Sequence, residues 1–165
     1  MVDYKIPYLG IERPILVIDD ELLTFKYNGE NFLVHKRYLE DISVLAERWL
    51  RKQAAIYIPN RLRTLSVKIG IDKYKKIRIS NARSRWGSCS SKGTVSFNWR
   101  LIMAPVGVID YVIVHELVHL IEMNHSRNFW KIVGQVMPDY VDKRKWLRMY
   151  GHKLMTFNLE KPVGL

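Results

Sequence analysis

The 165 residues of this chain, 48% of them hydrophobic and 26% charged, are enough for one compact domain with a buried core. They exclude a mainly disordered chain and leave no room for several independent catalytic domains. The net charge of +11 comes from residues 35–165, which hold 24 basic and 10 acidic side chains, whereas residues 1–34 hold three basic and six acidic ones.

Short strands are predicted in residues 14–34. Ile15–Ile18 and Leu22–Tyr27 are apolar runs of strand length. The pair Asn28-Gly29 then predicts a tight turn, which leads into the apolar residues Phe32–Val34.

A long helix is predicted from about residue 38 to Gly70. Its apolar residues recur at intervals of three and four, while charged residues cover the other face. The apolar set is Leu39, Ile42, Leu45, Ala46, Trp49 and Leu50. Pro59 is expected to interrupt or restart this helix, because proline lacks the backbone N–H that the helix needs.

Two more strands and three helices are predicted in the second half. The strands are expected around Ile77 and Ile79 and at Thr94–Asn98, with turn-forming residues at 90–93 between them. Strands followed by helices indicate an α+β fold. The helix boundaries come from single residues: Pro105 opens a long helix, Ser126 caps a second one, and Asp139 caps a last one that ends near Gly151.

The segment His115-Glu116-Leu117-Val118-His119 carries the strongest functional signal. Helical residues four apart differ by about 40° and one turn, so His115 and His119 aim two imidazoles at one point, which suits a zinc ion. Glu116 cannot point along the same line, but it can reach a water held by the metal, as a general base requires.

A catalytic zinc site needs a third protein ligand, and His125 is the natural candidate. The chain has to bend between His119 and His125, and Asn124 tolerates the left-handed conformation that we expect at this bend. Glu122 is the rival ligand, because it lies seven residues after His115 on the same helix face.

The two other histidines, His35 and His152, have no such neighbours in the sequence. They are expected to be ordinary surface or packing residues.

Several segments together resemble the YgjP-like metallopeptidase family. The strong part of the resemblance runs from about Ile77 to Trp130, and a weaker part extends from about Trp49 to Met149. The residues that carry it are Arg83-Ser84-Arg85-Trp86-Gly87-Ser88-Cys89-Ser90, Phe97-Asn98-Trp99-Arg100-Leu101, Ile109-Asp110-Tyr111-Val112-Ile113-Val114-His115-Glu116-Leu117-Val118-His119, Asn124-His125-Ser126 and Phe129-Trp130. The chain is similar as well to the SprT-like proteases, which act on DNA-bound proteins.

The resemblance implies a zincin-like peptidase domain, in which a small antiparallel sheet packs on an active-site helix with further helices N- and C-terminal to it. It implies zinc as the cofactor, with His115, His119 and His125 as ligands and Glu116 as the catalytic glutamate. Residues 1–34 depart from the family pattern, since they are short and slightly acidic. We expect residues 1–165 to form one domain. It would consist of a β-rich portion at residues 1–35, a helical portion at residues 36–76 and a catalytic core at residues 77–155.

The segment around Trp86 and Gly87 is expected to form a strand beside the active-site helix. Its exposed edge would bind an extended peptide by main-chain pairing, although Trp86 can equally serve only to pack on the helix. Cys89 is expected to be a small buried residue rather than a nucleophile, because no histidine adjoins it in the motif. As the only cysteine, it also excludes an intramolecular disulfide and a cysteine-based zinc cluster.

The expected reaction is hydrolysis of a peptide or an unfolded protein. Zinc lowers the pKa of its water, and Glu116 takes the proton as the peptide carbonyl is attacked. A second donor to the developing oxyanion is usually needed. Tyr111, Tyr140 and Arg85 are the candidates, and the sequence does not choose among them.

Two other functions remain open at this stage. One is a nucleic-acid-associated zinc protein, with or without proteolysis, recruited by a basic segment that contains Lys73, Lys75, Lys76, Arg78, Arg83 and Arg85. The other is a metal-dependent hydrolase for a non-peptide amide or ester. We find no signal peptide and no membrane-spanning run, so a cytoplasmic protein without a membrane partner is expected.

Overall fold

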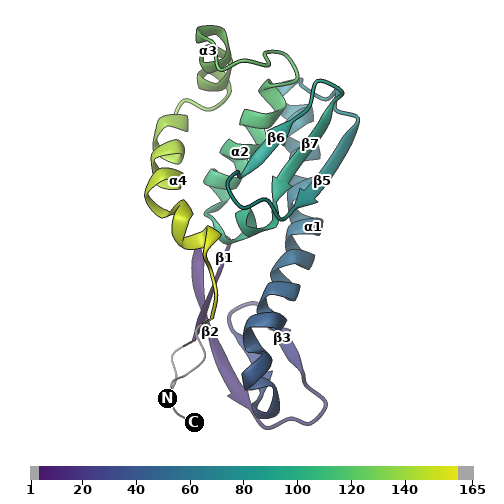
Figure 1. Cartoon of the computed structure of the whole chain (residues 1–165), viewed down its shortest axis with the longest axis vertical. Coiled ribbons are helices and arrows are strands. Elements are labelled where there is room, and N and C mark those ends of the chain that lie inside the picture. The colour runs from purple at the N-terminus through teal and green to yellow at the C-terminus, as the bar shows by residue number, and fades with distance from the viewer. Residues whose placement is uncertain (1–3, 160–165) are drawn as a thin grey trace.

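The longest element, the helix α1 (Ile42–Ile69), follows the long axis of the molecule and connects a small sheet at each end (Figure 1). This computed structural model describes residues 4–159. Pro59 lies inside α1 and does not interrupt it, contrary to the sequence prediction. The flanking side chains Ile58 and Leu62 are fully buried, and their packing keeps the helix continuous up to Gly70, which adopts a left-handed conformation at φ 72°.

The N-terminal sheet has the strand order β1-β2-β4-β3. Its strands are β1 (Lys5–Tyr8), β2 (Ile11–Ile18), β3 (Phe25–Tyr27) and β4 (Phe32–His35). The predicted hairpin is confirmed, because β3 and β4 are antiparallel and Tyr27 is paired with Phe32 across Asn28-Gly29. The apolar run at 22–27 forms a strand only from Phe25, and Leu22 is 98% exposed.

The second sheet, with the order β5-β7-β6, is mixed rather than antiparallel as expected. It consists of β5 (Lys76–Ser80), β6 (Gly87–Cys89) and β7 (Thr94–Asn98). β7 is parallel to β5 and antiparallel to β6. The connection from β5 to β6 crosses to the far side of β7, where the Asn98 amide donates hydrogen bonds to the carbonyls of Ala82 and Arg85.

The remaining elements confirm the predicted α+β class. They are the short 3-10 helices η1 (Lys36–Asp41) and η2 (Trp99–Met103) and the helices α2 (Val106–Val118), α3 (Arg127–Val136) and α4 (Tyr140–Met155). The Ser126 hydroxyl accepts a hydrogen bond from the Phe129 N–H at 3.2 Å, as predicted for an N-cap. α4 continues four residues beyond the predicted end at Gly151.

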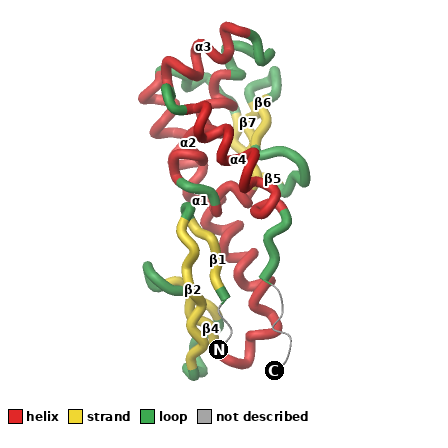
Figure 2. The backbone as a smooth tube through the Cα atoms, turned by 90° about the vertical axis from the view of Figure 1, so that its left-hand side faces the viewer, coloured by secondary structure: helices red, strands yellow, loops and turns green. Residues whose placement is uncertain are grey.

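The helix α2 lies between the second sheet and the helices α3 and α4, at the end of the molecule away from the N-terminal sheet (Figures 1 and 2). Most of its side chains are buried, so the helix is held on several sides. Within residues 4–159, no helix combines the length and the apolar character that crossing a bilayer requires.

Candidate metal centre

Three histidines converge at the C-terminal end of α2. The Nε2 atom of His125 lies 3.0 Å from Nε2 of His115 and 3.1 Å from Nε2 of His119. His115 belongs to α2, His119 ends it, and His125 lies in the loop before α3. The structure therefore brings the three predicted histidines together, with ligand atoms within 4.8 Å of one another.

The bend between His119 and His125 does not use a left-handed asparagine. Leu9 is the one non-glycine residue with a positive φ in residues 4–159, so the prediction for Asn124 was wrong. A series of short turns ends α2 instead, in which the Leu120 and Ile121 N–H groups donate to carbonyls three residues back. The chain can therefore reverse with ordinary right-handed or extended residues.

The helix α3 fixes the histidine rings through two aromatic side chains. Phe129 is fully buried, and its ring centroid lies between 4.5 and 4.9 Å from all three imidazoles. The Trp130 ring stacks on His125 at 5.8 Å and lies at the same distance from His115. The Ser126 cap thus positions two rings that leave the imidazoles little freedom.

The donor chemistry of this cluster fits a cation. A neutral imidazole has one N–H and one lone pair, so His125 Nε2 cannot make a satisfied hydrogen bond to two further imidazole nitrogens at once. Three lone pairs that point at one centre suit a metal ion. Tetrahedral zinc would separate its nitrogen ligands by about 3.3 Å, which is close to the observed 3.0 and 3.1 Å.

Burial favours the neutral, metal-binding form of two of the imidazoles, those of His115 and His125. It lowers the pKa of His115 to about 3, with further lowering from His119, His125 and Arg144. The pKa of His125 is lowered by the same kind of causes, burial first. Protons therefore do not compete with a metal ion for His115 near neutral pH.

Glu122 lies beside the cluster rather than in it. Its carboxylate accepts a hydrogen bond from the Asn128 amide at 3.1 Å, and its backbone carbonyl lies 3.0 Å from Nδ1 of His119. That second contact sets the orientation of the His119 ring, as outer hydrogen bonds do in metal sites. His125, and not Glu122, is therefore the third member of the cluster.

Glu116 is buried next to His115, with 5% of its surface exposed. Burial raises the pKa of its carboxyl group to about 8, and the charge of Arg85 opposes that shift. The carboxylate packs against β6, where a Cβ atom added to Gly87 would lie 2.6 Å from Oε1. The sequence-predicted strand beside α2 is therefore confirmed, and its glycine makes room for this carboxylate.

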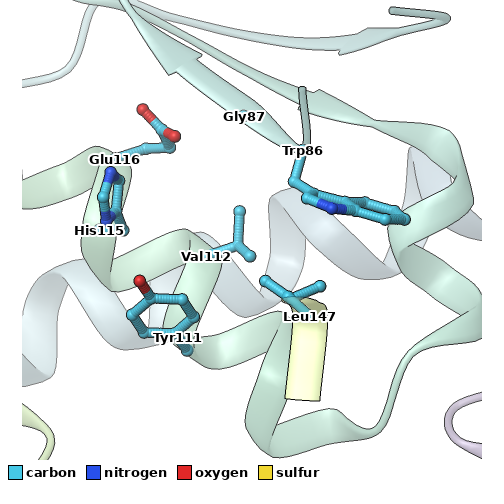
Figure 3. Close-up of a pocket in the computed structure, with 7 residues that line it drawn as sticks. All are labelled: Trp86, Gly87, Tyr111, Val112, His115, Glu116 and Leu147. Atoms are coloured by element: carbon cyan, nitrogen blue, oxygen red, sulfur yellow. The ribbon is translucent and has the colours of Figure 1, made fainter. Parts of the chain in front are cut away.

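A pocket of about 220 Å³ opens beside Glu116 and His115 (Figure 3). Its walls are largely apolar and come from α2, α4 and the start of β6. The lining residues are Trp86, Gly87, Tyr111, Val112, His115, Glu116 and Leu147. This arrangement offers a carboxylate, an imidazole and space for a substrate side chain in one place.

The three predicted oxyanion donors have different surroundings. Tyr111 lines the pocket, with its hydroxyl on the side of His115 in Figure 3. Tyr140 stacks on Trp130 with 5.4 Å between the centroids, and Arg85 is exposed. Among the three proposed oxyanion donors, only Tyr111 belongs to the pocket lining within the described residues.

The remaining histidines and the cysteine lie outside the histidine cluster, and Cys89 is half-buried rather than buried as expected. His35 is buried at the end of β4, lies 3.3 Å from the Asp19 carboxylate and accepts a hydrogen bond from the Arg37 N–H. His152 is exposed on α4. Burial and the charge of Glu116 raise the pKa of Cys89 to about 11, so its thiol stays protonated.

The sequence analysis missed Arg144 of α4. Its guanidinium carbon lies 4.7 Å from the Trp130 ring centroid, and its charge contributes to the lowered pKa of His115 and His125. The helical spacing of Tyr140, Arg144 and Leu147 could have indicated that one face of α4 turns toward the site.

The sequence matches one family model. A family model described as "YgjP-like, metallopeptidase domain" matches residues 3–150, so the similarity includes the N-terminal residues that depart from the expected pattern. A search of curated proteins gave no match.

Two solved structures are similar in fold. The metallopeptidase zymogen of Pyrococcus abyssi abylysin has 25% sequence identity and a TM-score of 0.50, over 57% of this chain and 92% of that one. The metallopeptidase zymogen of Methanocaldococcus jannaschii jannalysin has 17% identity and a TM-score of 0.49, over 56% of this chain and 94% of that one.

Proposed function

This chain belongs to the YgjP-like metallopeptidase family, and from that membership we propose that it hydrolyses peptide bonds at a zinc ion held by His115, His119 and His125. The observation that carries the proposal is the convergence of three imidazole nitrogens beside the buried carboxylate of Glu116.

Zinc is the metal that this donor set suits best. Three neutral imidazoles with an open fourth position are typical of catalytic zinc sites. When bound, zinc lowers the pKa of its water toward about 7 and polarises the peptide carbonyl.

Glu116 is proposed as the general base. Its raised pKa, about 8, places the carboxyl group where it can both accept and release a proton near neutral pH. The carboxylate takes the proton of the attacking water and later delivers it to the leaving amine. Gly87 supports this role, because a side chain at this position would collide with the Glu116 carboxylate.

The proposed substrate is an extended peptide or an unfolded protein. β6 lies at the edge of its sheet and starts at Gly87, next to Glu116, so a substrate main chain paired along β6 would pass the carboxylate. The apolar walls of the pocket, formed by Trp86, Val112 and Leu147, would accept one substrate side chain. The lone free cysteine fits a cytoplasmic site of action, which we include in the proposal.

Two variants with one matched control test this function. Glu116→Gln should retain zinc, measured by elemental analysis, and lose about 10²- to 10⁴-fold in turnover of an unfolded protein. His125→Ala should lose the metal, whereas His152→Ala, on exposed α4, should keep both metal and activity. Full activity in Glu116→Gln would show that the base is another residue.

A second candidate function is that of a zinc protein that binds nucleic acid, with or without proteolysis. The observation that favours it is a set of exposed cations around β5, which form no ion pair within residues 4–159: Lys73, Lys75, Lys76, Arg78, Arg83 and Arg85. Binding to a phosphate backbone should weaken steeply as salt rises. Affinity for single-stranded DNA that does not change with salt concentration would rule this candidate out.

A further inference from the structure

We propose that Arg144 binds a carboxylate group of the peptide substrate beside the histidine cluster. The inference rests on the proposed peptidase function and adds a substrate class, namely peptides that carry a carboxylate close to the scissile bond. The carboxylate can belong to an acidic side chain or to the C-terminus of the substrate.

The position of Arg144 is set by aromatic stacking. Its guanidinium lies over Trp130, 4.7 Å from the ring centroid, and Trp130 in turn lies 5.8 Å from the rings of His115 and His125. Tyr140, one turn earlier on α4, stacks on the same indole. The cation is therefore held one aromatic ring away from the imidazoles.

No carboxylate of residues 4–159 neutralises Arg144. The neighbouring Lys143 forms an ion pair with the carboxylate of Asp139 at 3.0 Å. The carboxylate of Glu122 accepts a hydrogen bond from the Asn128 amide. Arg144 is exposed, and its guanidinium forms no hydrogen bond or ion pair within residues 4–159. A planar guanidinium with free donors matches a carboxylate in a two-point contact.

The same face of α4 continues along the substrate pocket. Leu147, one turn after Arg144, lines the pocket (Figure 3), and Gly151, one turn further, would contact Trp86 through an added Cβ at 3.2 Å. A substrate side chain in the pocket would therefore lie one helical turn from the guanidinium. This face of α4 therefore fits a substrate in which an apolar side chain lies next to a carboxylate in the sequence.

Peptide binding to the zinc-loaded Glu116→Gln protein tests the inference without turnover. The probes are end-blocked alanine–leucine peptides in which a single Glu is moved along the sequence, each paired with its Gln counterpart, and a second series with a free C-terminal acid or amide. We expect at least one acidic peptide to bind about 10- to 100-fold more tightly than its neutral partner. The series in which this occurs identifies the source of the carboxylate.

Arg144→Met should abolish this difference and leave the affinity for neutral peptides unchanged, whereas Arg144→Lys should keep part of it. Arg48→Met is the matched control. It also removes one exposed arginine charge, but near the N-terminal end of α1, which lies at the far end of the molecule from α2 (Figure 1). The inference is overturned if no acidic peptide is preferred, if Arg144→Met weakens both peptides equally, or if Arg48→Met has the same effect. Failure of the wild-type protein to hydrolyse any peptide would count against the peptidase function and not against the selective binding.

Discussion

Gly87 is the residue at which the site tolerates no side chain. An added Cβ would lie 2.6 Å from Oε1 of Glu116 and 2.7 Å from its Cγ, so Gly87→Ala has to displace the proposed base. We expect a loss of about 10²-fold or more in turnover with normal metal content, because the histidines keep their positions. Hydrolysis rates and elemental analysis of the same preparations measure both quantities.

Ser88→Ala serves as the control for Gly87→Ala. Ser88 is the next residue of β6 and is paired with Ser96 of β7, so the substitution tests the strand without touching Glu116. Equal losses in the two variants would indicate damage to the strand rather than to the base.

Cys89 gives a prediction that depends on pH. Its pKa is raised to about 11, first by burial and then by the charge of Glu116, so its thiolate is rare at pH 8. We expect alkylation of the folded protein by iodoacetamide to be about 100-fold slower at pH 8 than alkylation of the unfolded chain, and to accelerate as pH rises toward 11. Mass spectrometry of the labelled protein follows the reaction, and rapid labelling at pH 8 would contradict the raised pKa.

At the scale of elements, an ion pair joins α1 to α2 in addition to their packing. Arg61 of α1 donates two hydrogen bonds of 2.7 Å to the Asp110 carboxylate, which lies on α2 five residues before His115. Asp110 is mostly buried and Arg61 is about one third exposed. The pair therefore anchors the helix that carries the first two histidines.

Asp110→Asn should destabilise the protein by about 1–3 kcal/mol, because it leaves a partly buried guanidinium without its countercharge. Urea unfolding of Asp110→Asn, Arg61→Met and the double variant measures the coupling between the two side chains. A coupling energy near zero would mean that α2 is held by apolar packing alone.

The elements that the sequence predicted well are those defined by local signals. Ser126 caps α3 because its hydroxyl bonds a nearby N–H, and the Asn28-Gly29 turn joins adjacent strands. The convergence of His115 and His119 follows from helical geometry alone. Each of these features depends on residues only a few positions apart.

The features that were mispredicted or missed depend on contacts between distant residues. Pro59 stays helical because buried neighbours on both sides pack against the rest of the protein. The parallel pairing of β5 with β7 and the approach of Arg144 to Trp130 join segments that the sequence separates. Periodicity and capping signals carry no information about such pairings.

At the scale of the whole molecule, the N-terminal sheet is attached to the 3-10 helix η2, which comes just before the active-site helix α2. The turn between β1 and β2 donates backbone hydrogen bonds from Leu9 to Ile102 at 2.9 Å and from Gly10 to Met103 at 3.2 Å. Figure 2 shows this hairpin beside α1 and below α2. We therefore propose that residues 1–165 form one cooperative domain, in which the sheet supports the metal site.

Gly10→Ala tests this coupling. Gly10 has a φ of 81°, and an added Cβ would lie 2.7 Å from the Cα of Pro105, the residue before α2. Gly29→Ala is the matched control, because Gly29 also has a positive φ but has no atom within 4 Å of an added Cβ. Both variants bear the backbone strain of about 1–2 kcal/mol, and only Gly10→Ala adds the collision with the backbone at α2.

We expect Gly10→Ala to lower the free energy of unfolding by about 1–3 kcal/mol more than Gly29→Ala, and to weaken zinc binding as well. Urea unfolding followed by fluorescence and by far-UV circular dichroism should show a single shared transition for each variant, since one domain unfolds as a unit. Two separate transitions, or equal effects of the two substitutions, would mean that the N-terminal sheet folds independently of the site. In that case the start of α2 would be fixed by α1 and the second sheet alone.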